Sequence, residues 1–151
     1  QDTVVYPILY LYRHHIEMQL KSIIRLAVKI LGEEVSNRWR KKLEQHDLQT
    51  LWQVIEPKLD PICKRANLPQ IPLEERQGIN AYMQQLNDHD PNGVSFRYGR
   101  ERDMSRTIGE GVVRINIRSF AVCMEKLSQY LDGLNGWLDD MATYARNADC
   151  V

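Results

Sequence analysis

Several features that would place a chain in a specialised class are missing from this sequence of 151 residues. No apolar run approaches the roughly 18 residues that a membrane-spanning helix requires. The formal charge is zero, so no whole-molecule field attracts a nucleic acid. The three cysteines are far apart and show no spacing typical of zinc ligands or of a disulfide framework. We therefore expect a cytoplasmic chain with no metal, no cofactor and no membrane partner.

The common sequence motifs of catalysis are missing as well. There is no glycine-rich phosphate loop, no GxSxG nucleophile motif, no HExxH zinc motif and no acidic metal cluster. These absences argue against most common enzyme classes. The length suits one domain that covers residues 1–151 and buries a core of its own.

Two long amphipathic segments, one near each end, dominate the hydrophobic pattern. Between residues 5 and 31, apolar residues recur at steps of three and four, which predicts a helix that starts close to Pro7 and stops at Gly32. The same spacing predicts a second long helix over residues 118–146. A neighbouring stripe of this helix has members seven residues apart: Cys123, Tyr130, Trp137 and Tyr144. We expect so broad an apolar face to meet other helices or a second subunit.

The first part of the middle region predicts a shorter helix. Asp47 is a typical N-cap for a helix over residues 48–55, whose apolar residues share one face. Pro57 and Pro61 lack the backbone N–H that a helix interior needs. We therefore expect them to interrupt or end this helix and to leave shorter helical pieces as far as about residue 67.

The rest of the middle region combines a helix with the least helical stretch of the chain. A helix is predicted from about residue 72 to a turn at residues 90–93. Residues 94–98 and 112–115 alternate like strands, and they could pair as a short β-hairpin near 94–116 or form an extended arm without a partner. Together these elements predict a mainly all-α fold, a four- to five-helix bundle with two long terminal helices.

Polar residues inside the first helix form one candidate site. Arg13 and Glu17 are four residues apart and His14 and Glu17 are three apart, so each pair can meet on the helix surface. An Arg, a His and a Glu on one helix could bind a phosphate and move a proton. The alternative, which we favour, is a polar network that fixes the helix in place, with Arg13 paired to Glu17.

A second candidate is the pair of Arg40 and His46. In a continuous helix their side chains would lie about 120° apart around the axis, so they converge only if the helix ends or bends between them. The expected cap at Asp47 allows such a break. The alternative is that His46 packs at the start of the next helix and the basic residues around Arg40 form a solvated face.

A third candidate interleaves arginines with aromatic residues. Arg97 lies between Phe96 and Tyr98, and the arginine-rich stretch that follows includes Arg100 and ends with Asn116 and Arg118. In such a pattern the arginines can bind phosphates and the aromatic rings can stack on nucleic-acid bases. Equally, the aromatic residues could cover the core while Arg97 pairs with an acidic group.

With these residues described, the chain resembles the HEPN-type helical superfamily (higher eukaryotes and prokaryotes nucleotide-binding), and most of all a group of uncharacterised bacterial proteins. The matching segments are residues 6–17, 46–52, 96–98 and 115–118. The resemblance implies a four- to five-helix bundle that is often a homodimer. Many members of this superfamily are metal-independent ribonucleases of toxin or antiphage systems, so the resemblance also implies this activity. In these enzymes a His assists attack of an RNA 2′-OH on the adjacent phosphate, and an Arg stabilises the developing negative charge.

The resemblance leaves two hypotheses about function. The family's Arg-x(4–6)-His spacing is matched by Arg40 and His46, whereas the late helix, where that motif usually lies, has no His. Branches that lack the motif serve as binding or dimerisation modules. We favour such a module and expect it to be a homodimer, with RNA, a nucleotide or a protein of the same system as a further partner. In that module a polar network would consist of Arg13, His14, Glu17, His46, Arg97 and Asn116. The alternative is a ribonuclease that uses His46 or His14 together with Arg40, Arg13 or Arg97. The candidate binding residues are Glu17, Arg97, Arg100, Asn116 and Arg118.

Overall fold

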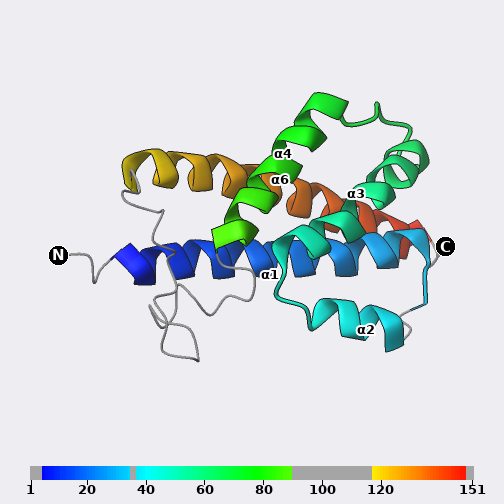
Figure 1. Cartoon of the computed structure of the whole chain (residues 1–151). Helices are drawn as coiled ribbons and strands as arrows, with labels where there is room; N and C mark the ends of the chain where they lie inside the picture. The colour runs from blue at the N-terminus through cyan, green and yellow to red at the C-terminus, as the bar shows by residue number, and fades with distance from the viewer. Residues whose placement is uncertain (1–4, 35–36, 90–116, 149–151) are drawn as a thin grey trace.

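The computed structural model describes residues 5–34, 37–89 and 117–148, and these ranges contain five helices and no strand (Figure 1). The helices are α1 (Val5–Leu31), α2 (Asn37–Leu43), α3 (Leu48–Arg65), α4 (Leu73–His89) and α6 (Ile117–Ala148). The prediction of a mainly all-α fold with two long terminal helices is confirmed. The hairpin predicted near 94–116 lies outside the described residues.

The two long helices run side by side in the same direction (Figure 1). Three polar pairs join them, each between residues 113 positions apart, which is the register of two parallel helices. His15 bonds to Ser128 at 2.8 Å, and the hydroxyl of Ser22 donates to the side-chain oxygen of Asn135 at 3.0 Å. The amide of Gln19 donates to Asp132 in the same row. The segment between the two helices must therefore carry the chain back along the length of α1.

Local signals set the helix boundaries around the loops. Gly32 has φ +67°, and the backbone N–H of Glu33 donates to the carbonyl of Val28 at 3.0 Å, so α1 closes with a left-handed glycine cap as predicted. Asp47 caps α3 by accepting a hydrogen bond from the backbone N–H of Thr50, as its position predicted. The basic segment of α2 carries no amphipathic spacing, and the sequence did not predict that helix.

The prediction that Pro57 and Pro61 interrupt or end their helix is wrong, because α3 continues from Leu48 to Arg65. The two prolines are four residues apart and both are exposed. The carbonyls that lose a helical N–H partner, those of Gln53 and Pro57, therefore lie on the same outer side, where water can bond to them. The buried side of α3 continues past both prolines through Leu59 and Ile62. The packing of that side outweighs the free-energy cost of the helical hydrogen bonds that the two prolines remove.

The core lies where α1 meets α3 and α6, with α4 packed against α3. The apolar stripes predicted for α1 and α6 supply a large part of it, and α3 and α4 supply much of the rest. Their buried members include Leu9, Ile16, Leu20, Ile23, Ala27, Met124, Leu127, Leu131, Leu134 and Leu138. Trp52 of α3 is fully buried among them. Among the helices that the structure describes, none has the length and apolarity needed to cross a bilayer.

One member of the predicted second stripe of α6 is not part of the core. Cys123, Tyr130 and Trp137 are half-buried against the core, but Tyr144 is 77% exposed. Seven residues fall about 20° short of two helical turns, so a stripe of this spacing rotates by about 60° between its first and last members. That drift carries Tyr144 to the outer side of α6.

Candidate functional site

Three charged side chains of α1 lie one turn apart and are withdrawn from solvent. Arg13 is 1% exposed and Glu17 is 5% exposed, and Lys21 is also buried. One oxygen of Glu17 is 3.2 Å from a guanidinium nitrogen of Arg13, and the other is 2.7 Å from the ammonium of Lys21. A single buried carboxylate therefore compensates two buried cations. Buried charges persist in a fold only with such partners.

The loop between α2 and α3 adds His46 to this group. Its Nδ1 is 2.9 Å from the Glu17 oxygen that also binds Lys21. Arg13 donates its second guanidinium nitrogen to the backbone carbonyl of His46. The loop is therefore attached to α1 through both its backbone and its side chain. We call the group of Arg13, Glu17, Lys21 and His46 the Glu17 cluster.

The imidazole of His46 is the solvent-facing part of the Glu17 cluster. Its side chain is 61% exposed, whereas the side chains of Arg13, Glu17 and Lys21 are at most 10% exposed. Because Nδ1 faces the carboxylate, the other ring nitrogen, Nε2, lies on the side away from Glu17. The cluster therefore presents one imidazole nitrogen to solvent, while the ion-paired side chains of Arg13, Glu17 and Lys21 lie buried beneath the ring.

Asp47 extends the connection to α4. One carboxylate oxygen caps α3 through the N–H of Thr50, and the other accepts a hydrogen bond of 2.7 Å from the side-chain amide of Asn87. His46 and Asp47 are adjacent, so α1, α3 and α4 are joined within two residues of the loop. This arrangement makes the loop a joint between three helices.

Both carboxylates of this joint are held in their ionised form. Burial raises the pKa of Glu17, but hydrogen bonds and positive charge from Lys21 and His46 outweigh it and lower the pKa below its ordinary value of 4.5. Burial likewise raises the pKa of Asp47, yet its bonds with Thr50 and Asn87 and the charge of Arg13 lower it below 3.8. The folded state is thus stabilised by two carboxylates that resist protonation.

These pKa shifts predict acid sensitivity. A carboxylate whose pKa is lowered by folding contributes stability above its unfolded pKa, and this stability is lost as the pH falls through the folded pKa. We expect the free energy of unfolding, measured by urea denaturation, to fall progressively below pH 4.5. Asp47→Asn keeps a capping side chain but cannot titrate, so its loss below pH 3.8 should be smaller than that of the wild type. Equal losses in both proteins would contradict this assignment.

The structure places the sequence-predicted site residues in different surroundings. The pairing of Arg13 with Glu17 is observed. The proposed contact between His14 and Glu17 is wrong, because His14 is exposed and its ring stacks on Tyr10 with centroids 5.7 Å apart. The side of α1 that carries His14 faces outward, and the histidine that reaches Glu17 is His46.

Of the remaining candidates, the structure describes Arg40 and Arg118, and neither is part of the Glu17 cluster. Arg40 is exposed on α2, and in the described part of the chain its guanidinium makes no hydrogen bond or ion pair with His46. The helix does end between the two residues, at Leu43, but this break does not join their side chains. Arg118 is exposed in the first turn of α6. Three other predicted binding residues lie outside the described residues: Arg97, Arg100 and Asn116.

Sequence reasoning missed two members of the joint. Lys21 lies four residues after Glu17, so the spacing rule that found Arg13 would also have found it. Asn87 lies 40 residues from Asp47, and no local pattern announces their contact. The described residues hold no group of three histidine, cysteine or acidic side chains suited to a metal ion.

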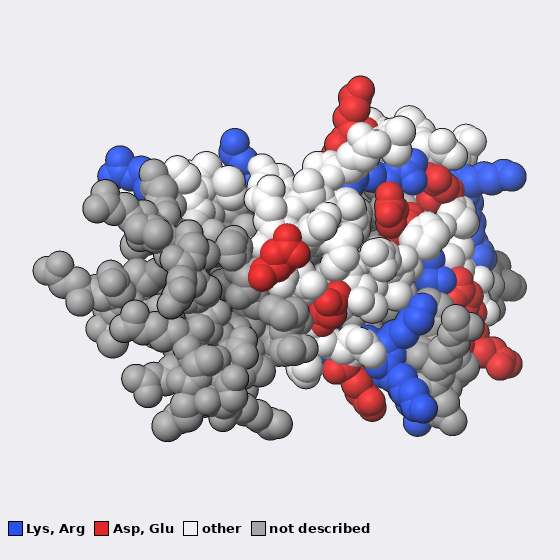
Figure 2. Space-filling view, viewed as in Figure 1, with Lys and Arg blue, Asp and Glu red and all other residues white. Residues whose placement is uncertain are grey.

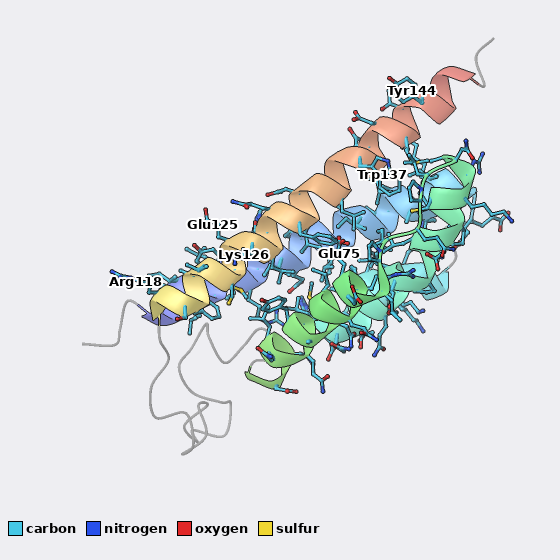
Figure 3. The ribbon with its side chains drawn as sticks, turned by 90° about the horizontal axis from the view of Figure 1, so that it is seen from above. Glu75, Arg118, Glu125, Lys126, Trp137 and Tyr144 are labelled. Carbon is cyan, nitrogen blue, oxygen red and sulfur yellow. The ribbon has the colours of Figure 1, made fainter. Side chains whose placement is uncertain are left out.

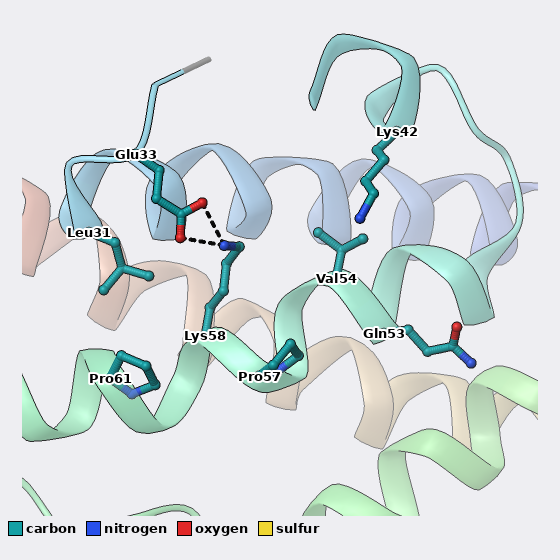
Figure 4. Close-up of a pocket in the computed structure, with 8 residues that line it drawn as sticks. All are labelled: Leu31, Glu33, Lys42, Gln53, Val54, Pro57, Lys58 and Pro61. Carbon is teal, nitrogen blue, oxygen red and sulfur yellow. Dashed lines mark hydrogen bonds and ion pairs between the residues drawn. The ribbon is translucent and has the colours of Figure 1, made fainter. Parts of the chain in front are cut away.

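A separate hollow lies between α2 and α3 (Figure 4). Its volume is about 260 Å³, and Lys42, Lys58 and Glu33 contribute charge to a lining that is otherwise largely apolar. The ammonium of Lys58 is bound to both oxygens of Glu33, at 2.5 and 2.7 Å. This ion pair joins α3 to the end of α1 across the hollow, and none of the residues lining the hollow belongs to the Glu17 cluster.

Comparisons with protein-family models, with curated proteins and with solved structures found no match to this chain. The relationship to the HEPN superfamily therefore stays a prediction from the sequence. The chemistry of the Glu17 cluster has to be judged from its own geometry.

Proposed function

We propose that this chain is a non-catalytic, HEPN-like helical module that binds a partner and dimerises within a bacterial RNA-related, toxin or antiphage system. The resemblance of four short segments to that superfamily supports the setting. The geometry of the Glu17 cluster supports the absence of catalysis. The partner is a second copy of the chain, an RNA or a protein of the same system.

The burial of Arg13 is the observation that carries this proposal. An arginine that stabilises a phosphate in a transition state must place its guanidinium on the phosphate oxygens. The guanidinium of Arg13 is instead engaged by Glu17 and by the carbonyl of His46, and the residue is 1% exposed. Releasing it would leave the carboxylate with one buried cation fewer and open the loop. A guanidinium engaged in this way is suited to holding the loop on α1 and not to binding a substrate phosphate.

The charge distribution on one face of the molecule also fits a module better than an extended nucleic-acid surface. Figure 2 shows acidic and basic side chains interspersed on the described part of this face, with some basic groups gathered near α2. A protein that tracks a nucleic-acid backbone presents a continuous basic patch or groove. RNA would therefore be recognised at a small site, such as the basic turn of α2.

A metal-independent ribonuclease is the second candidate, and the exposed imidazole of His46 favours it. Glu17 holds Nδ1, which fixes the ring and leaves Nε2 as the base that could take the proton of an RNA 2′-OH. The 2′-oxygen would then attack the adjacent phosphorus and the 5′-oxygen would leave. This candidate needs a cation at the phosphate, and the two buried cations of the cluster, Arg13 and Lys21, are already engaged by Glu17.

RNA incubation in the presence of a chelator tests the two candidates. The wild type, His46→Ala and His14→Ala should all leave a mixed single- and double-stranded RNA intact at every protein concentration. His14→Ala is the matched control, since His14 is an exposed histidine outside the Glu17 cluster. Cleavage by the wild type and by His14→Ala that is lost in His46→Ala would overturn the non-catalytic proposal and establish the ribonuclease.

A further inference from the structure

The side of α6 opposite to the core is an exposed strip with members three and four residues apart. We call it the outer face, and it consists of Arg118, Val122, Glu125, Gln129, Gly133, Gly136 and Asp140. Figure 3 shows Arg118 near the start of α6, Glu125 and Lys126 farther along it, and Tyr144 toward its end. Every residue in this strip is exposed, so no described helix covers it.

The residues of the outer face are unusual for a helix surface that meets only water. Two glycines in the middle of a long helix each cost about 1 kcal/mol relative to alanine. A Cβ added at Gly133 or Gly136 would meet nothing within 4 Å, so packing inside the monomer does not require either glycine. One turn from the start of the strip, Val122 is 46% exposed. Glycines on an outer helix surface allow a second helix to approach closely.

Charge is divided unequally along the exposed side of α6. The part before Gln129 carries two cations and one carboxylate: Arg118, Lys126 and Glu125. The part from Gln129 to Tyr144 carries three carboxylates: Asp132, Asp139 and Asp140. A copy of the helix laid against it in the same direction would place carboxylates opposite carboxylates. A copy laid in the opposite direction would place the acidic half opposite the half that carries the cations.

We propose that the outer face binds the outer face of a second copy, with the two α6 helices antiparallel and the two-fold axis at Gln129. This inference rests on the proposed dimerising function and names its surface. Arg118 and Asp140 each lie eleven residues from Gln129, so the symmetry brings them together twice. Val122 and Gly136 each lie seven residues from it, so the valine of one copy fills the space above the glycine of the other.

Cysteine crosslinking tests the direction of the pair. Gln129→Cys places two thiols at the axis, within the 4.4–6.8 Å between Cα atoms that disulfides commonly span. We expect this variant to form a covalent dimer on mild oxidation. Val122→Cys, on the same face but seven residues from the axis, should form no more than the wild type. A parallel pair would crosslink both variants, and either that result or no crosslinking at Gln129 would overturn the proposal. The wild type controls for the native cysteines.

Charge reversal tests the contacts and separates this proposal from the proposed function. Light scattering across a dilution series should show that Arg118→Asp and Asp140→Arg each raise the dimer dissociation constant at least about tenfold. The double variant Arg118→Asp/Asp140→Arg should restore it to within about threefold. Arg25→Asp, at an exposed position on α1, is the control. A wild type that stays monomeric at all concentrations would overturn the dimer, whereas RNA cleavage in the assay above would overturn only the non-catalytic function.

Discussion

Replacing Glu17 with Gln should lower the free energy of unfolding by about 3–5 kcal/mol, because the change leaves Arg13 and Lys21 buried without the carboxylate that compensates them. Glutamine keeps nearly the same volume, so the loss reports charge and hydrogen bonding rather than packing. Urea denaturation at pH 7 measures it, with the slope of the transition as a check that the compactness of both states is unchanged.

The matched control for this prediction is Glu34→Gln. Glu34 is an exposed glutamate just after α1 and lies outside the proposed dimer face, so we expect its replacement to change the free energy of unfolding by no more than about 0.5 kcal/mol. A loss for Glu17→Gln as small as that of the control would mean that solvent reaches the buried cations and compensates them. The Glu17 cluster would then have no structural role.

Trp52→Ala should be destabilising to a similar extent, by about 3–5 kcal/mol, since it removes a fully buried aromatic side chain from the core. Trp52 lies among the buried residues that join α1, α3 and α6. Its indole nitrogen has no hydrogen-bond partner among the described residues, so the loss should come from packing alone. Thermal or urea unfolding followed by far-UV circular dichroism measures the change without relying on tryptophan fluorescence.

Two further substitutions calibrate the effect of Trp52→Ala. Trp52→Phe keeps most of the apolar volume and loses no hydrogen bond, so it should cost clearly less than the alanine variant. Leu73→Ala removes an apolar side chain that is 64% exposed, and its effect should stay within about 0.5 kcal/mol. A Trp52→Ala variant as stable as Leu73→Ala would contradict the assigned core.

The helices were predictable to the extent that their apolar residues are periodic. The spacing of three and four in α1 and α6 gave both long helices within about a residue of their observed starts, and Gly32 and Asp47 gave two boundaries. α3 was predicted too short because a proline rule is local, whereas its prolines lie on the exposed side of a helix held by its buried side. α2 was missed because a short basic helix has no apolar stripe.

The candidate site was predictable only where its residues share one helix. Four-residue spacing predicted the ion pair between Arg13 and Glu17, whereas three-residue spacing assigned His14 to a contact with Glu17 that it does not make. The histidine that does bind Glu17 is 29 residues away, so its contact depends on how α2 and α3 pack against α1. No spacing in the sequence contains that information.

The Glu17 cluster accounts for most of the charged side chains that this small helical bundle buries. Replacing such a group by apolar residues often leaves stability unchanged or improved, so its presence indicates a second purpose. Here the cluster fixes one loop against α1 by its backbone and by its side chain, and the adjacent Asp47 fixes α4. The joint therefore acts together with the apolar core to fix the relative positions of these three helices.

The central claim is that Arg13 serves Glu17 within the fold and is not available to a substrate. A double-mutant cycle with Arg13→Met, Glu17→Gln and their combination measures it most directly in urea denaturation at pH 7. If the claim is right, the combined variant is more stable than the sum of the single losses implies, with a coupling free energy of at least about 1.5 kcal/mol. Losses that add to within about 0.5 kcal/mol would show that the two side chains act independently, and the claim would be wrong.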